Sequence, residues 1–346
     1  MSEQRKREPI LQVRNLKQYF PIRGGVLGRV RNHVKAVDDI SFDVYPGETL
    51  SVVGESGCGK STTGRCILRL QEPTDGQIIF EGEDITALPL REMRLRRTDM
   101  QIIFQDPYAS FNPRQTIHQL LNEAMAIQKI NPPGGRRARI VELLELVGLR
   151  AAHIDRYPHE FSGGQRQRIA IARALSVNPK LIICDEAVSA LDVSVQAQVI
   201  NLLMKLQKEL GLTYIFVAHD LGVVRRISDR IIVMYLGQIA EVGETHRIFE
   251  RPQHPYTRAL LSAIPIPDPA QRHAPISLEG DVPSPVDPPT GCPFHTRCPY
   301  VMDRCIVEKP PLHELGPDQA GACHLLESGP VDYASLQPRR PADASA

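Results

Sequence analysis

Residues 54–61 read Gly-Glu-Ser-Gly-Cys-Gly-Lys-Ser, which is the spacing of a loop that binds phosphate groups. The glycines allow several backbone N–H groups to point at one anion. An apolar run at 49–53 predicts a buried strand before the loop, and 60–70 predict a helix after it. Because helix starts favour phosphate, we expect Lys60 to contact the outer phosphates and the Ser61 hydroxyl to bind Mg2+. The residues expected to bind a nucleotide here are Gly54, Glu55, Ser56, Gly57, Cys58, Gly59, Lys60, Ser61 and Thr62.

Two carboxylates follow a second apolar run. Residues 181–184 predict a buried strand that ends at Asp185 and Glu186. A carboxylate at such a strand end can hold a metal ion, so we expect Asp185 to bind Mg2+ together with Ser61 and Gln105. Glu186 points to the other side of the strand end, and we expect it to orient and deprotonate an attacking water. The alternative interpretation is an ordinary exposed Asp-Glu pair.

Two further polar residues follow predicted strands. His219 comes after the strand predicted at 213–218, and its imidazole can donate to a γ-phosphate oxygen. Gln105 comes after the apolar run 100–104 and can reach either Mg2+ or the water. Ligands of parallel sheets gather at the carboxyl ends of the strands. We therefore expect three catalytic residues, Glu186, His219 and Gln105, beside the phosphate loop.

The stretch Ser162-Gly163-Gly164-Gln165 is a second phosphate-binding signal. Ser162 is a natural N-cap for a helix predicted to run to Val177, and the bare N–H groups at such a helix start form an anion site. A helical insert at about 106–162 separates this stretch from the phosphate loop. We therefore do not expect the two surfaces to meet within one monomer, and a head-to-tail pair of chains would place a nucleotide between them. The residues expected to contact it from this side are Ser162, Gly163, Gly164 and Gln165.

An aromatic pair ends the first predicted strand, at residues 9–20. Phe20, or its neighbour Tyr19, can stack on a nucleotide base, and plain core packing is the alternative. Residues 21–33 are rich in Gly and Arg and predict an exposed loop.

Composition sets broad limits on function. The 346 residues are 42% hydrophobic and 23% charged, which is ordinary for a globular protein. A net charge of +1 favours neither nucleic acid nor a membrane surface as a partner. The apolar runs are too short to span a bilayer, and the first residues do not resemble a signal peptide. We therefore expect a cytoplasmic protein with reduced cysteines.

Strands alternate with helices through the first 250 residues, which predicts an α/β fold with a mainly parallel sheet. Helical spacing of apolar residues recurs at 117–125 and 140–147 within the insert. Beyond residue 250 the chain is dense in Pro and shows little periodicity. We expect a nucleotide-binding domain at 1–250, an extension without a large core of its own at 251–330, and a disordered tail at 331–346.

Four cysteines gather in the predicted extension with the spacing C-x5-C-x6-C-x17-C. In a reduced compartment clustered cysteines favour a metal over disulfides. The spacing is wider than the C-x2-C of most zinc sites, and four thiolates also suit a [4Fe–4S] cluster. An iron–sulfur cluster, zinc and no metal all remain open. The four residues are Cys292, Cys298, Cys305 and Cys323; Cys58, Cys66 and Cys184 are expected to be small buried residues.

The motifs together resemble those of ABC-type ATPases, in the order of that family: the phosphate loop, Gln105, the Ser162 stretch, the strand 181–186, the loop 189–192 and His219. The resemblance covers residues 10–245. It implies a P-loop NTPase fold with a RecA-like core, an antiparallel β subdomain and a helical subdomain. It also implies that ATP, with Mg2+, is sandwiched between the phosphate loop of one subunit and the Ser162 stretch of another. A groove beside Gln105 would receive a coupling helix from a membrane partner.

The resemblance extends beyond the ATPase motifs. The tract Arg-Pro-Gln-His-Pro-Tyr-Thr at 251–257 is similar to the C-terminal extension of oligopeptide/dipeptide importer ATPases, and the whole chain resembles the second ATPase of bacterial dipeptide permeases. This implies a peripheral subunit at the cytoplasmic face of the inner membrane that couples ATP hydrolysis to peptide uptake. Implied partners are a paralogous or identical ATPase, two transmembrane permeases and, indirectly, an extracytoplasmic solute-binding protein. Members of this group carry a [4Fe–4S] cluster on a similar cysteine pattern.

Other functions remain open at this point. Importers of nickel, glutathione or oligosaccharides share the same plan. A soluble ABC ATPase acting on ribosomes or DNA usually carries two motif sets or a long coiled-coil insert, whereas this chain has one set. A purely regulatory nucleotide-binding module is disfavoured by the complete set of catalytic residues. The chain departs from the family at Ala187, where proline is usual, and we expect the change to be tolerated because Glu186 is intact.

Overall fold

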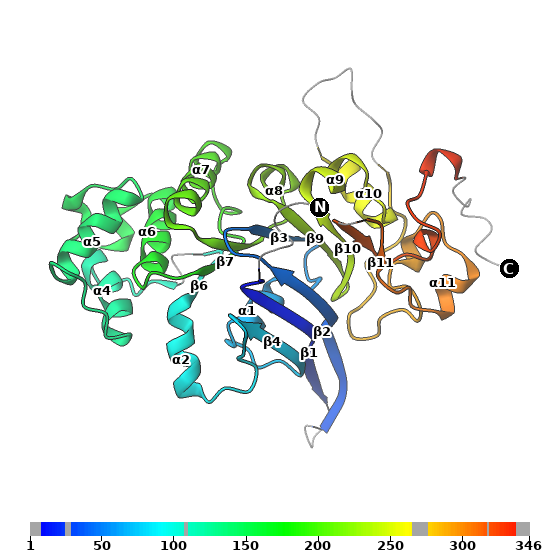
Figure 1. The fold of residues 1–346 in the computed structure, drawn as a ribbon, viewed down its shortest axis with the longest axis horizontal. Coiled ribbons are helices and arrows are strands. Elements are labelled where there is room, and N and C mark those ends of the chain that lie inside the picture. The colour runs from blue at the N-terminus through cyan, green and yellow to red at the C-terminus, as the bar shows by residue number, and fades with distance from the viewer. Residues whose placement is uncertain (1–7, 25–28, 107–109, 265–275, 317, 337–346) are drawn as a thin grey trace.

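The computed structural model describes residues 8–24, 29–106, 110–264, 276–316 and 318–336. They form two sheets with helices packed around them (Figure 1). The larger sheet has the strand order β11-β12-β10-β9-β3-β8-β7-β6, and the smaller has the order β2-β1-β4-β5. The expected alternation of strands and helices is confirmed. None of the helices in this described part of the chain combines the length and apolarity that a bilayer crossing needs.

The centre of the larger sheet is parallel, as expected. Its parallel strands are β3 (Thr49–Val53), β6 (Met100–Ile103), β7 (Leu181–Asp185), β8 (Thr213–Val217) and β9 (Arg230–Tyr235). Strands β3, β7 and β8 are buried along their whole length, which is why each reads as a continuous apolar run. Val217 is opposite both Val52 and Asp185 in the register. The residues after these three strands therefore meet at one edge of the sheet.

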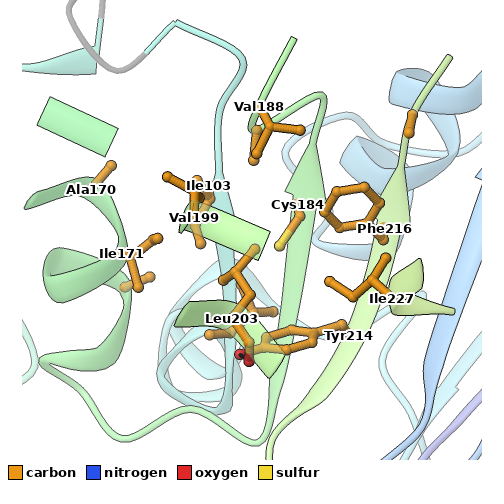
Figure 2. Packing of buried hydrophobic residues seen from close by; sticks show 14 of the residues in the cluster. Ile103, Ala170, Ile171, Cys184, Val188, Val199, Leu203, Tyr214, Phe216 and Ile227 are labelled. Carbon is orange, nitrogen blue, oxygen red and sulfur yellow. Dashed lines mark hydrogen bonds between the residues drawn. The ribbon is translucent and has the colours of Figure 1, made fainter. Parts of the chain in front are cut away.

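Helices cover this sheet and build a separate helical group. Their bounds are α1 (Lys60–Ile67), α2 (Leu90–Asp99), α4 (Ile117–Ile127), α5 (Gly135–Leu146), α6 (Gly163–Leu175), α7 (Val193–Leu210), α8 (Leu221–Ile227), α9 (Thr245–Glu250), α10 (Pro255–Ser262) and α11 (Asp303–Val307). Figure 2 shows Leu203 of α7 beside Tyr214 of β8, in the same core cluster as Ile171 of α6. The Tyr214 hydroxyl donates to the Leu203 carbonyl over 3.1 Å, so the buried phenol is satisfied.

Helices α4 and α5 lie within residues 106–162, the range expected for a helical insert. Helices α4, α5 and α6 pack on one another and stand together beside β6 (Figure 1). Helix α4 starts at a capping box in which the Thr116 hydroxyl accepts from the Gln119 backbone N–H. Helix α2 was not predicted, because its leucines Leu90 and Leu95 are 62% and 67% exposed and leave little apolar stripe to detect.

The smaller sheet corrects one prediction. Its strands are β1 (Leu11–Gly24), β2 (Arg29–Val44), β4 (Asp75–Phe80) and β5 (Glu83–Asp84), and all its pairings are antiparallel. The prediction of a loop at 21–33 is wrong for the described residues of that range. They belong to β1 and β2, where Ile22 pairs with Asn32 and Arg23 with Val30. This arm is largely solvent-exposed, so its residues do not alternate between apolar and polar and gave no strand pattern.

The residues after 250 fold back onto the larger sheet. Strand β12 (Gln319–Gly321) pairs with β10 (Gln238–Glu244), and β11 (His313–Glu314) pairs with β12. The fully buried Glu241 carboxylate accepts from the backbone N–H groups of Gln253 and His254, at 2.8 and 2.9 Å, and from the Gln319 amide at 2.8 Å. The predicted extension thus uses the sheet of the preceding residues as its core.

The tail predicted from residue 331 starts in contact with the body. The Val331 N–H donates to the Gln253 side chain over 2.7 Å, and the Tyr333 hydroxyl donates to the Gln253 carbonyl over 2.6 Å. A short 3-10 turn follows at Tyr333–Ser335. The disorder predicted for 331–336 is therefore not found, because these groups have partners; residues 337–346 lie outside the described part.

Candidate functional site

The phosphate loop joins β3 to α1, as its sequence predicts. Gly54 and Gly59 have φ values of 151° and 103°, which side chains rarely adopt. A Cβ at Gly54 would collide with the Met234 carbonyl oxygen, and one at Gly59 with the Ala36 carbonyl oxygen. The loop is thus pressed against Met234, near the end of β9, and Ala36, in the middle of β2, and only glycine fits at these two positions.

Lys60 lies inside the curve of this loop and is 5% exposed. Its Nζ donates to the carbonyls of Gly54 and Glu55, at 2.8 and 2.9 Å. Phosphate oxygens can accept the same N–H groups, so this amine is suitably placed for an anion.

The structure brings Ser61 and Asp185 together from α1 and β7. The Ser61 hydroxyl donates to Asp185 Oδ1 over 2.5 Å, and the carboxylate is 4% exposed. Arg65, one turn after Ser61, lies 3.6 Å from Asp185 Oδ2 and was missed by the sequence reasoning. The (i, i+4) spacing from Ser61 to Arg65 was the available signal. A hydroxyl beside a carboxylate is the hard-oxygen donor set that Mg2+ prefers, so these residues fit the ion.

The three proposed catalytic side chains meet at the same edge. Glu186 Oε2 accepts from Gln105 Nε2 over 2.9 Å and lies 3.5 Å from His219 Nδ1. Glu186 has φ 49°, while its N–H still donates to the Val217 carbonyl of β8 over 3.0 Å. A residue in the left-handed conformation at a strand end is strained, and the conformation changes the direction of its side chain. Here the Glu186 side chain points toward Gln105 and His219. Gln105 hydrogen-bonds Glu186 rather than Ser61 or Asp185.

The Ser162 stretch starts helix α6. Ser162 and Gln165 form the reciprocal capping box, with bonds of 3.4 and 3.1 Å. A Cβ at Gly164 would collide with the Val195 side chain of α7, so the second glycine permits this close approach. Helix α6 packs with α4, α5 and α7, whereas α1 packs against β1, β2, β7 and β8 (Figure 1). The two phosphate-binding candidates therefore belong to different parts of the fold.

The two aromatic residues of β1, Tyr19 and Phe20, have different surroundings. The Tyr19 hydroxyl donates to Asp38 over 2.5 Å, and burial together with this carboxylate raises the pKa of Tyr19. Phe20 is half-buried and lies opposite Val34, on the hairpin whose Ala36 touches Gly59. Phe20 is thus the freer of the two rings.

The four predicted ligand cysteines converge. Cys292, Cys298, Cys305 and Cys323 line one cavity of about 10 Å3, beside His254. Burial raises the pKa of Cys292 to about 11 and that of Cys323 to about 12. Within the described ranges, however, no group of three or more His, Cys, Asp or Glu residues is arranged to hold a metal ion. The remaining cysteines, Cys58, Cys66 and Cys184, are buried as expected.

Comparison with known proteins agrees with this architecture. Residues 37–189 match the sequence profile "ABC transporter", and residues 240–305 match "Oligopeptide/dipeptide transporter, C-terminal region". The chain is 52% identical over 321 residues to the oligopeptide transport ATP-binding protein AppF of Bacillus subtilis, covering 92% of this chain and 98% of the relative.

Solved structures give the same result. The dimeric ATP-binding cassette MJ0796, bound to ADP and Pi, matches with a TM-score of 0.60 and 28% identity over 68% of this chain and 98% of that one. CbiO1 of Clostridium perfringens, part of the ABC transporter complex cbiONQ, matches with a TM-score of 0.60 and 28% identity over 70% and 91%. The chain therefore belongs to the ABC transporter family, as an ATPase that carries the oligopeptide/dipeptide transporter C-terminal region.

Proposed function

We propose that this ATPase drives an importer of dipeptides or oligopeptides. The observation that carries the proposal is the match of residues 240–305 to a region of oligopeptide/dipeptide transporters, outside the ATPase motifs. The relative AppF, named for oligopeptide transport, matches along 92% of the chain and supports the same conclusion. Importers of nickel, glutathione or oligosaccharides are the alternatives, because the solute is expected to bind on other subunits.

ATP is proposed to bind at the phosphate loop. Lys60 and the loop N–H groups would hold the phosphates, and Phe20 would stack on the base. Mg2+, held by Ser61 and Asp185 with Gln105 nearby, would neutralise phosphate charge. Glu186, hydrogen-bonded by Gln105, would orient the attacking water and accept its proton. His219 would donate to the γ-phosphate as charge develops there.

The active unit is proposed to be a dimer of ATPases. Ser162 is exposed at the start of α6, and α6 and α1 pack against different elements. A second subunit would therefore supply its Ser162, Gly163, Gly164 and Gln165 to the nucleotide. The similar cassette MJ0796, whose structure is dimeric, supports the pairing of two ATPases. A paralogous ATPase is the proposed partner, with an identical copy as the alternative. The pair would bind two permeases at the cytoplasmic face of the membrane, with a solute-binding protein on the other side.

A reconstitution experiment tests the function. The chain is purified with its co-expressed permeases, and ATP-dependent uptake of a labelled dipeptide into proteoliposomes is measured with the binding protein present. Stimulated dipeptide uptake is the expected result. If nickel, glutathione or an oligosaccharide is taken up instead, that compound replaces peptide as the assigned solute. Co-purification with ribosomes or DNA would overturn the transport role.

We also propose that the cysteine cavity holds a [4Fe–4S] cluster, with zinc as the alternative. The convergence of four thiols on one cavity supports soft-metal binding, although the side chains would have to move apart to admit a cluster into about 10 Å3. Iron, sulfide and zinc contents of anaerobically purified protein distinguish the two metals. Absence of all three would show that the thiols are structural.

The proposed division of the chain is a nucleotide-binding part at 1–250, with its helical insert at about 106–162, and an extension at 251–330. The insert is supported by the mutual packing of α4, α5 and α6. Limited proteolysis under native conditions tests the division, since cleavage near residue 250 is expected only if the two parts separate.

A further inference from the structure

One side chain of the phosphate loop is held by the C-terminal extension. Both oxygens of the Glu55 carboxylate accept from the Arg297 guanidinium, with bonds of 2.9, 3.2 and 3.2 Å. The Arg297 side chain is 9% exposed and that of Glu55 is 25% exposed. A forked, largely desolvated pair of this kind fixes the carboxylate in one direction. The two residues are 242 positions apart, and neither belongs to the other's motif.

A second bond from the extension holds the same residue. The Glu55 backbone N–H donates to the Tyr256 hydroxyl over 2.9 Å. Tyr256 is fully buried and packs against Tyr235 and Phe294, with ring centroids 4.7 and 5.4 Å apart. This N–H is therefore turned away from the inside of the loop. Since Lys60 donates to the Glu55 carbonyl, the position of Glu55 also bears on the position of the lysine amine.

Charge explains why such an anchor is needed. A carboxylate in a loop that receives a polyphosphate repels it, and the repulsion is strong where water is partly excluded. Arg297 both neutralises the Glu55 carboxylate and keeps it on the extension side of the loop. Loss of the guanidinium would leave a half-buried carboxylate free to approach the phosphates.

We propose that Arg297 is a positioning residue for nucleotide binding, acting through Glu55. The inference rests on the proposed assignment of residues 54–61 as the ATP site. It gives the extension a direct role in ATP affinity, in addition to any role in assembly or metal binding. The charge of Glu55 is what makes Arg297 necessary.

A double-mutant cycle tests this in the full-length protein. KM for ATP, kcat and the affinity for a fluorescent ATP analogue are measured for Arg297→Ala in the wild-type and the Glu55→Gln backgrounds. Arg297→Ala is expected to raise KM and weaken binding roughly tenfold with a smaller effect on kcat, from one like charge a few ångströms from the phosphates. In the Glu55→Gln background the same change is expected to cost less than about twofold. An equal loss in both backgrounds, or a loss confined to kcat, would overturn the proposal.

Two further variants keep the result interpretable. If Arg297→Ala does not fold, Arg297→Lys is placed in the same cycle, where loss of the fork is expected to raise KM about threefold only when Glu55 is present. Arg304→Ala is the matched control, since Arg304 bonds Glu308 and Glu327 within the extension; its KM is expected to match wild type. Lys60→Ala checks the premise. If Lys60→Ala leaves ATP binding intact, the assigned ATP site is wrong. If Lys60→Ala abolishes ATP binding while Arg297→Ala has no effect on it, only the inference about Arg297 is wrong.

Discussion

The sheet edge and the cysteine cavity position their proposed functional groups in opposite ways. At the edge, Ser61, Asp185, Glu186 and His219 come from ends of regular elements and are within 2.5 to 3.5 Å of one another in pairs. In the cavity, three thiols come from irregular chain or the borders of short turns, and the fourth, Cys305, comes from the short helix α11. Among the described residues they converge without a group arranged to hold a metal. Parallel strands fix the first set through backbone register, whereas the second set is held by single backbone bonds, such as the one from the Cys292 N–H to the Cys305 carbonyl over 2.8 Å.

The largest expected effect concerns Glu186 at the sheet edge. Glu186→Gln keeps the hydrogen-bonding shape but removes the proposed base, so kcat for ATP hydrolysis should fall by about 10² to 10⁴. ATP affinity should be retained, as measured by equilibrium binding. Glu145→Gln, on the exposed face of α5, is the control. Near-normal hydrolysis by the Glu186 variant would remove the base assignment.

The next largest effect is expected at Glu241, which connects β10 to the residues after 250. Glu241→Ala leaves two buried N–H groups and the Gln319 amide without their acceptor, so the free energy of unfolding should drop by about 3 kcal/mol. Urea denaturation measures it. Glu209→Ala, an exposed carboxylate 3.7 Å from Lys205, should change stability by less than about 0.5 kcal/mol. Equal changes for both variants would mean that Glu241 does not anchor the extension.

A smaller effect is expected at the cysteine cavity. Cys298→Ser replaces a soft donor of the proposed [4Fe–4S] site by a hard one, so on that proposal the iron content of anaerobically purified protein should fall to less than about half of the wild-type content. Iron and sulfide analysis against the wild type measures this, with Cys66→Ser as the control in the core. Unchanged iron in the Cys298 variant would exclude the four thiols as the ligand set.

The smallest effect is expected at Ala187, where the family usually has proline. Ala187 is 2% exposed and lines a cavity of about 100 Å3 together with Gly163 and Leu191. This space accommodates a ring, so Ala187→Pro should alter kcat less than about twofold. Steady-state ATP hydrolysis assays measure this kcat. A tenfold decrease in kcat would show that the loop after Glu186 depends on the alanine.

The sequence predicted what rests on local pattern. Strand β3 has the bounds that its continuous apolar run predicts, Thr49–Val53. Ser162 is predicted as an N-cap because serine is a favoured residue at that position, and it does cap α6. The exposed arm of β1 and β2 and the exposed helix α2 were missed, since neither shows a buried face.

The long-range contacts could not be predicted from pattern. Nothing in the local sequence around Arg297 points to Glu55, and nothing around Glu241 points to Gln319. Such pairs depend on how the irregular chain after residue 250 returns to the sheet. Arg65 was not predicted. Its helical spacing from Ser61 indicates a shared face of α1, but that spacing does not reveal Asp185 as its partner.

The pairing of β12 with β10 has a practical consequence for engineering. Two family profiles match separate parts of this chain, residues 37–189 and 240–305. A protein engineer could therefore consider joining the extension of one relative to the ATPase of another. Cutting after residue 250 would turn β10 into an open edge, ready to pair with other chains and aggregate. A chimera should therefore exchange β10 and β12 together as one interlocked unit.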